Sequence, residues 1–402
     1  MVVWRVAAIG MLPLFPRVSW DRPMVGVMKV AQIFLQAVVK VTPRGSSMVA
    51  IVVCMSTEEM TWAELLETLL AGESLSAETS AWAMDRLMSG ELNEGQIAGF
   101  LVALRAKGET GPELLGLSES MMAKAVPLSI PGPALDIVGT GGDRLGTVNI
   151  STMSSLVAVG TGARVVKHGN RGASTTAGAA DVIEALGVDL ALPAERVAAA
   201  AEQVGITFLF AQQFHPAMKH VMGARRALGV RTVFNFLGPI SNPARPEAQA
   251  LGCASMELAP QMAQTLAVRG TRALVFRGQD GRDKITTSAA TDIWEVRDGA
   301  VTHTELRPAD VGLPEVAVND LRGGTAEHNA QVLRSVLSGA PGPVRDAVLL
   351  NAAGGLVALD EEAEDADLVS RLRSKMELAA ESIDSGAAAG VLQNWVDYSS
   401  PS

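Results

Sequence analysis

The sequence predicts an α/β protein in which a small N-terminal helical domain precedes a larger domain built on a mainly parallel sheet. Between residues 62 and 125, apolar residues recur every three or four positions, which is the periodicity of helices. After residue 133, short β-rich runs alternate with helix-patterned stretches, which favours a parallel sheet covered by helices. The 402 residues are 48% hydrophobic and 19% charged, so the chain is long enough for two or three domains.

Charge and cysteine content exclude several classes of function. Forty-three acidic and 33 basic residues leave a net charge of −10, which argues against a general nucleic-acid or anionic-membrane binder. Only Cys54 and Cys253 occur, so neither a disulfide framework nor a cysteine-rich zinc site is expected, and the cytoplasm is the expected location. The sequence has no uninterrupted run of about 18 apolar residues, so no membrane helix is predicted.

Residues 1–54 differ from the remainder of the chain. They contain six basic residues and one acid, a net charge of +5, whereas residues 55–402 carry −15. Pro13 and Pro16 break the apolar run that has the length of a signal-peptide core. From Met55 onward, the sequence resembles the ordinary N-terminus of a cytosolic protein. We therefore interpret residues 1–54 as a start-site extension without a role in the chemistry.

Residues 55–128 are predicted to form the helical domain, joined in space by helices near residues 195–228. Ser76 and Asn93 occupy positions suited to helix N-caps, and Gly90 and Gly108 positions where helices end. This region contains no motif that carries chemistry. Its expected role is packing or formation of a homodimer.

Residues 129–402 are predicted to form the α/β domain. Strands are expected at residues 134–138, 163–166, 207–211, 232–236, 273–276 and 291–296, and helices at residues 181–186, 218–228 and 258–268. In such sheets, ligands bind beyond the carboxyl ends of the strands. The loops that follow these strands are therefore the places to look for a site.

Two glycine-rich polar loops follow the first two predicted strands. Gly139-Thr-Gly-Gly-Asp143 leads to a helix that opens near Asn149, and glycines and helix N-terminal amides suit a phosphate group. Asp143 either accepts a hydrogen bond from a ligand or caps its own loop. The chain lacks the P-loop pattern, and Lys167 stands where a dinucleotide-binding fold has an acid.

The second loop, residues 167–175, is a second candidate anion site. Lys167 and Arg171 can neutralise phosphates, and Asn170, Ser174 and Thr175 can hydrogen-bond to them. A charged surface turn is the alternative interpretation. Because the two loops follow consecutive strands, one polyanionic ligand shared between them is the simpler account.

Four further motifs follow the two loops along the chain: Phe214-His-Pro, Arg225-Arg-x-Leu-Gly, Arg231-Thr-Val-Phe-Asn-Phe-Leu-Gly-Pro and Gly342-Pro-Val-Arg-Asp. With these ordered motifs, the chain resembles the anthranilate phosphoribosyltransferase family, whose fold is that of the nucleoside phosphorylase-like phosphoribosyltransferases. The resemblance extends over roughly residues 60–395. It implies transfer of the 5-phosphoribosyl group from phosphoribosyl pyrophosphate (PRPP) to anthranilate, the second step of tryptophan biosynthesis from chorismate, in a homodimer.

The resemblance also implies which residues bind each substrate. The positions that would bind PRPP are Gly139, Gly142, Asp143, Thr147, Asn149, Ile150, Ser151, Thr152, Lys167, His168, Gly169, Asn170, Arg171, Gly172, Ala173, Ser174, Thr175 and Ala179. Those that would line the anthranilate site are Gly139, His168, Asn170, His215 and Arg225. His168 and His215 are the candidate proton acceptors, although each is equally well interpreted as a hydrogen-bonding wall residue.

The implied cofactor is Mg²⁺, with Ser151 and Asp283 as candidate ligands. Here the chain departs from the family, which typically has Asp-Gly-x-Asp-Glu where this sequence has Asp280-Gly-Arg-Asp-Lys284. A cation thus replaces a metal-ligating carboxylate. Either Mg²⁺ binds more weakly, which we favour, or Lys284 contacts the pyrophosphate. In the first case, Lys284→Glu lowers the Mg²⁺ requirement.

Two alternatives to this function remain at this stage. One is a pyrimidine nucleoside phosphorylase-like enzyme, which shares the architecture and would accept a nucleoside instead of anthranilate. The other is a catalytically weakened paralogue that acts by binding, because of Lys284. Turnover with anthranilate, PRPP and Mg²⁺ separates all three.

Overall fold

The computed structural model describes residues 39–40, 51–52, 60–172, 177–361 and 366–400. The chain forms two compact units, Met1–Thr61 and Trp62–Ser402. In the first unit, β1 (Val39–Lys40) and β2 (Ile51–Val52) pair antiparallel. The remainder of the proposed extension, residues 1–54, lies outside the described residues. None of the helices in the described ranges has the length and apolar character needed to cross a bilayer.

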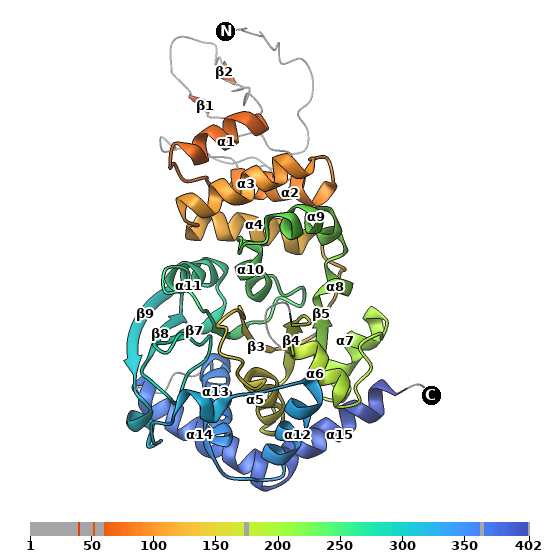
Figure 1. Cartoon of the computed structure of the whole chain (residues 1–402), viewed down its shortest axis with the longest axis vertical. Coiled ribbons are helices and arrows are strands. Elements are labelled where there is room, and N and C mark those ends of the chain that lie inside the picture. Colours follow the sequence, from red (N-terminus) through yellow and green to blue (C-terminus); the bar gives the residue numbers. More distant parts are fainter. Residues whose placement is uncertain (1–38, 41–50, 53–59, 173–176, 362–365, 401–402) are drawn as a thin grey trace, which may run out of the picture. The chain divides into compact units, whose positions relative to one another are not determined.

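The second unit begins with a helical domain (Figure 1). Its four helices are α1 (Trp62–Leu70), α2 (Ala77–Ser89), α3 (Glu94–Lys107) and α4 (Gly111–Ala123). Both predicted N-caps are confirmed, because Ser76 Oγ accepts from Thr79 N at 3.1 Å and Asn93 forms a capping box with Gln96. Gly90 ends α2 in the left-handed conformation, with φ of 79°.

A seven-stranded sheet forms the centre of the α/β domain, in the order β5-β4-β3-β6-β7-β8-β9. Its strands are β3 (Leu135–Gly139), β4 (Val165–Gly169), β5 (Ile206–Phe210), β6 (Ala248–Gly252), β7 (Arg272–Gly278), β8 (Thr291–Arg297) and β9 (Ala300–Leu306). The first five in this order run parallel, and β8 and β9 are antiparallel additions. The predicted mainly parallel sheet is confirmed.

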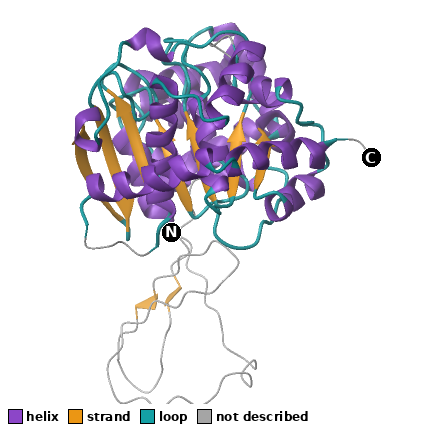
Figure 2. Ribbon diagram, turned by 90° about the horizontal axis from the view of Figure 1, so that it is seen from below, coloured by secondary structure: helices purple, strands orange, loops and turns teal. Residues whose placement is uncertain are grey.

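Helices cover this sheet, as Figure 2 shows. Those of the first half are α5 (Ile150–Gly160), α6 (Ala179–Ala185), α7 (Ala194–Gln203), α8 (Ala211–Phe214), α9 (Lys219–Leu228) and α10 (Phe234–Leu237). Those of the second half are α11 (Leu258–Arg269), α12 (Ala326–Leu337), α13 (Pro343–Leu359), α14 (Leu368–Asp384) and α15 (Ala387–Ser399). Short 3₁₀ turns are η1 (Pro216–Met218), η2 (Gly238–Ile240), η3 (Pro308–Val311) and η4 (Val318–Leu321).

Side-chain alternation along the strands divides the core into two main clusters. Leu274 and Phe276 of β7 belong to the cluster that contains α5 and α13, whereas Ala273 and Val275 belong to the cluster that continues into α1–α4. The second cluster also includes α9, α10 and α11. The helical domain is thus packed against the sheet through one continuous apolar core.

Three features of the fold differ from the sequence-based expectations. Residues 232–236, predicted as a strand, contain the start of α10, because Asn235 Oδ1 accepts from Thr232 N at 2.9 Å and closes a local turn. Strands β6 and β9 were not predicted. Of the helices near residues 195–228, α9 packs on α2 and α3, whereas α7 packs on β5 of the sheet.

Candidate active site

The predicted loops meet at the carboxyl ends of neighbouring strands. Parallel pairing places β3 between β4 and β6, with Gly139 in register with Gly252. Lys167, His168 and Gly169, expected in a loop, are the last residues of β4. Because neighbouring parallel strands end at the same edge of the sheet, these residues of β4 lie next to the loop that follows β3.

The loop after β3 depends on close backbone approach. Gly141 and Gly142 have φ of 67° and 77°, in the region that favours glycine. The Arg231 guanidinium donates to the Gly142 carbonyl from Nη2 and occupies the space where a Cβ atom on Gly142 would lie. Arg231 therefore contacts this loop, and a side chain at residue 142 would require the Arg231 guanidinium to move.

The N-terminus of α5 supplies the next group of predicted residues. Asn149 is the N-cap, followed by Ile150, Ser151 and Thr152 in the first turn. Asn149 Oδ1 accepts from Asn329 Nδ2 at 2.8 Å, and Thr152 Oγ1 is buried without a hydrogen-bond partner among the described residues. Thr147, before the helix, accepts from Arg282 Nε at 2.9 Å. These amides and hydroxyls suit an anion at a helix N-terminus.

Lys167 is buried beneath the two loops. Its Nζ donates to the Ile137 carbonyl and lies 3.3 Å from Ser151 Oγ. Burial lowers the Lys167 pKa to about 8, against the raising effect of Asp136. Burial raises the Asp136 pKa to about 6, although Lys167 and the Asn242 amide favour its charged form. A buried positive charge thus lies directly under the proposed phosphate site, balanced by a carboxylate.

The second loop is held by α6. The Arg171 guanidinium forms ion pairs with Asp181 and Glu184 and stacks on the Phe210 ring at 5.4 Å, so its charge is directed toward α6. Asp181 also accepts from Gly172 N at 2.9 Å. Asn170 is exposed, and Ala179 is the first residue of α6. Ala173, Ser174 and Thr175 lie outside the described residues.

The two candidate histidines lie side by side. Their ring centroids are 5.2 Å apart, and burial lowers the pKa of His168 to about 3 and of His215 to about 4. His168 Nδ1 bonds to the Gly238 carbonyl at 3.0 Å, and His215 Nε2 to the Ser241 carbonyl at 3.0 Å. His168 Nε2 is buried without a partner among the described residues. Both rings are therefore neutral, and His168 has an available acceptor nitrogen.

These depressed pKa values predict that stability falls as the pH falls. An unfolded histidine binds a proton below about pH 6.5, whereas folded His215 remains neutral down to about pH 4. At pH 5, His215 alone should contribute about 2 kcal/mol less to the unfolding free energy than at pH 7.5. Urea unfolding of the wild type and His215→Asn at both pH values measures this difference. Equal losses in the two proteins would contradict it.

Arg225 lies apart from the phosphate loops, on α9. Its guanidinium stacks on the Phe234 ring at 5.1 Å and contacts Met222 Sδ at 3.7 Å. No carboxylate among the described residues pairs with it, and burial lowers its pKa. A half-buried guanidinium without an acidic partner is suited to a ligand carboxylate.

Asp283 and Lys284 reach the same strand ends from the loop after β7. Asp283 Oδ2 accepts from Gly141 N at 2.7 Å, and Lys284 Nζ pairs with Asp283. Burial and the charge of Asp283 raise the Asp143 pKa, so a second carboxylate is near. One or two carboxylates plus ligand phosphates are a suitable donor set for Mg²⁺. The residues therefore fit this ion, but one of the carboxylates already pairs with an ammonium.

Several residues that hold the candidate site residues in place are not predicted from the sequence. Asp136, Asn242 and Gln249 form a buried polar cluster behind Lys167, Asn329 holds Asn149, and Arg231 holds the Gly142 loop. All of them act through contacts between residues far apart in the chain. One of them is indicated by the sequence, because Asp136 is a charged residue inside the otherwise apolar strand at residues 134–138, where it needs a buried polar partner.

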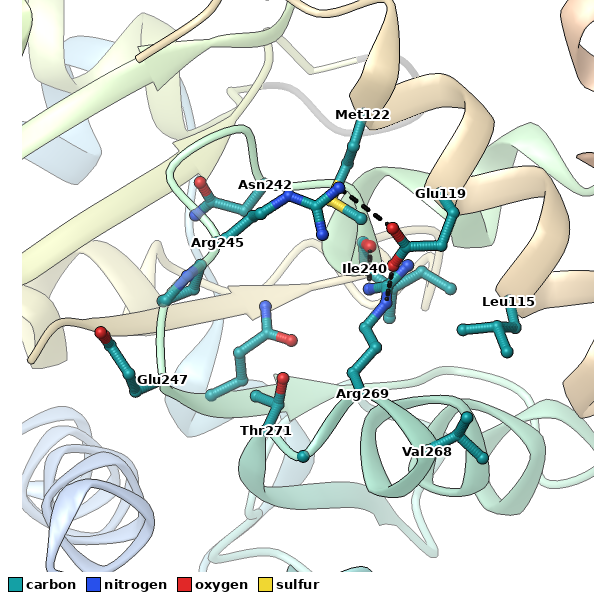
Figure 3. Close-up of a pocket in the computed structure, with 13 residues that line it drawn as sticks. Leu115, Glu119, Met122, Ile240, Asn242, Arg245, Glu247, Val268, Arg269 and Thr271 are labelled. Atoms are coloured by element: carbon teal, nitrogen blue, oxygen red, sulfur yellow. Dashed lines mark hydrogen bonds and ion pairs between the residues drawn. The ribbon is translucent and has the colours of Figure 1, made fainter. Parts of the chain in front are cut away.

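Asn242 is one of the residues that line a separate pocket (Figure 3). None of the residues predicted to bind substrate lines it. Its main polar feature is Glu119 of α4, which pairs with Arg245 at 3.0 Å and with Arg269 of α11 at 2.7 Å. These ion pairs connect the helical domain to the α/β domain.

The fold and site define a glycosyl transferase with a helical bundle and an α/β domain. The α/β domain model of the glycosyl transferase family matches residues 131–389, and its helical bundle model matches residues 63–125. Anthranilate phosphoribosyltransferase from Arthrobacter sp. (strain FB24) is 56% identical over 84% of this chain and 95% of the relative. That from Nocardioides sp. (strain ATCC BAA-499 / JS614) is 55% identical over 84% and 98%.

This chain is also similar to solved structures of anthranilate phosphoribosyltransferases. The crystal structure of anthranilate phosphoribosyltransferase from Thermus thermophilus matches with a TM-score of 0.77 and 42% identity, over 83% of this chain and 98% of that one. The Saccharomyces cerevisiae enzyme in complex with PRPP and Mg matches with a TM-score of 0.76 and 29% identity, over 85% and 98%. The chain belongs to the anthranilate phosphoribosyltransferase family.

Proposed function

We propose that the loops after β3 and β4 bind PRPP in the reaction of this family, transfer of its 5-phosphoribosyl group to the amino group of anthranilate. The products are N-(5-phosphoribosyl)anthranilate and pyrophosphate, in the second step of tryptophan biosynthesis from chorismate. The observation that supports these residue assignments most strongly is the buried Lys167 beneath two phosphate-suited loops. Its charge favours a polyanion at the shared strand ends.

In the proposed arrangement, this chain mainly binds and orients the two substrates. The bond from the ribose anomeric carbon to the pyrophosphate oxygen breaks, a bond to the anthranilate nitrogen forms, and that nitrogen loses a proton. An aromatic amine is already a nucleophile, so positioning and charge stabilisation supply most of the rate enhancement. His168 Nε2 is the ring nitrogen available to accept the proton or a hydrogen bond from the amine.

We propose that Mg²⁺ binds with PRPP, with Asp283 and Ser151 as the candidate protein ligands. When bound, the ion neutralises the charge that develops on the leaving pyrophosphate. The solved S. cerevisiae relative was obtained with PRPP and Mg, which supports this proposal. Asp143 adds a nearby carboxylate that the sequence analysis assigned only to PRPP.

The experiment that tests the function is a turnover assay on the full chain. Consumption of anthranilate should require both PRPP and Mg²⁺, and pyrophosphate should form in equal amount. Parallel reactions with a pyrimidine nucleoside and inorganic phosphate should give no product. Nucleoside cleavage without anthranilate consumption would favour the phosphorylase alternative, and no turnover with tight PRPP binding would favour the binding paralogue.

We also propose a homodimer formed through the helical domain, in a cytoplasmic enzyme. The helical domain has exposed apolar side chains, since Leu70 of α1 and Val102 of α3 are 71% and 45% exposed. Apolar side chains gathered on one domain favour association. Light scattering of the purified chain checks the dimer. The cytoplasmic location rests on the scarcity of cysteine.

Residues 1–54 are expected to be dispensable. Both family matches begin after them, at residues 63 and 131. A chain that begins at Met55 should therefore match the full chain in anthranilate turnover and in melting temperature. Measuring both quantities side by side is the test, and a large loss of either would refute the proposal.

A further inference from the structure

Lys284 places an ammonium group at the end of β3, inside the proposed PRPP site. Its side chain is only 13% exposed, and its Nζ contacts the Asp283 carboxylate and, at 3.0 Å, the Asp283 carbonyl. A Cβ atom on Gly139 would lie 3.2 Å from this Nζ. The ammonium thus lies against the backbone of Gly139, where β3 ends and the first phosphate loop begins.

Several charged groups face Lys284 from the surrounding elements. Asp283 comes from its own loop, Asp143 from the loop after β3, and Lys167 from β4. Lys284 and Lys167 are close enough that the charge of Lys284 lowers the Lys167 pKa. The charges of the two ammonium groups therefore act on the same region, and among the described residues only Asp283 forms an ion pair with Lys284.

We propose that Lys284 is a fixed cation of the pyrophosphate-binding site, which gives this chain binding of PRPP and pyrophosphate that persists without Mg²⁺. The inference rests on the proposed function and concerns the same site. Asp283 holds the ammonium on one side, and the pyrophosphate oxygens contact it on the other. Because Lys284 also occupies one oxygen of Asp283, Mg²⁺ competes with it for that carboxylate.

Calorimetric titration of inorganic pyrophosphate tests the proposal, with the full chain in EDTA and again in Mg²⁺. The wild type should bind pyrophosphate in EDTA, Lys284→Met should bind at least about tenfold more weakly, and Lys284→Arg should stay within about threefold. Lys375→Met is the matched control, since it also removes an ion-paired lysine but on α14, and its affinity should be unchanged. Melting temperatures verify that each variant is folded.

The charge reversal Lys284→Glu should change pyrophosphate binding in two ways, one without Mg²⁺ and one with it. It should abolish pyrophosphate binding in EDTA and lower the Mg²⁺ concentration needed for half-maximal binding, because it replaces the competing cation with an oxygen ligand. Equal affinities of wild type and Lys284→Met in EDTA would overturn the proposal, as would a wild type that binds only with Mg²⁺. A wild type that neither binds pyrophosphate in Mg²⁺ nor turns over anthranilate would refute the proposed function instead.

Discussion

Lys167→Met is expected to lower kcat/KM for PRPP by at least about 100-fold, because it removes the buried positive charge beneath both phosphate loops. The same change leaves the Asp136 carboxylate buried without its compensating lysine. Removing the charge that compensates a buried carboxylate destabilises a protein, here by roughly 1–3 kcal/mol. The variant should therefore lose both activity and unfolding free energy.

A second substitution separates these two effects. Asp136→Asn in the Lys167→Met background removes the unpaired carboxylate and keeps the side-chain volume, so much of the unfolding free energy should return. The kinetic defect for PRPP should remain, since no cation has been restored. Urea unfolding and steady-state kinetics of the single and double variants measure both quantities. Recovery of activity in the double variant would show that Lys167 acts only structurally.

Arg225→Gln is expected to raise KM for anthranilate about 10- to 100-fold and to leave KM for PRPP nearly unchanged. Its guanidinium is held by Phe234 and Met222 and has no acidic partner among the described residues, so a substrate carboxylate is its expected partner. A charge-assisted hydrogen bond contributes about 1.5–3 kcal/mol. Arg225→Lys should recover only part of the affinity, because an ammonium lacks the two-pronged donor geometry.

The neighbouring arginine provides the control for this prediction. Arg226 is on the same helix and is exposed, so Arg226→Gln should leave both KM values unchanged. Separate titrations of the two substrates against each variant distinguish the assignments. If Arg225→Gln instead weakened only PRPP binding, the anthranilate site would have to be placed elsewhere.

Prediction from sequence succeeded where the determinants are local. Ser76 and Asn93 cap helices through bonds to residues three positions later, and the glycine-rich turn after β3 requires φ values that glycine favours. It failed at residues 232–236, where an asparagine-mediated turn overrides the strand-like composition. It also missed β6, whose sequence Ala-Gln-Ala-Leu-Gly lacks β-branched residues and forms a strand because it lies between β3 and β7.

The sequence by itself determined the fold class, the two phosphate loops and the family, because periodicity, turn chemistry and ordered motifs are all written in short segments. Only the tertiary structure decided how the charges are used. It directs Arg171 toward Asp181 and Glu184, buries Asp136 near enough to Lys167 to raise the Lys167 pKa, and brings Lys284 to Gly139 across 145 positions of the chain. Electrostatic interactions depend on distance and burial in space, and neither is encoded in the spacing of residues along the chain.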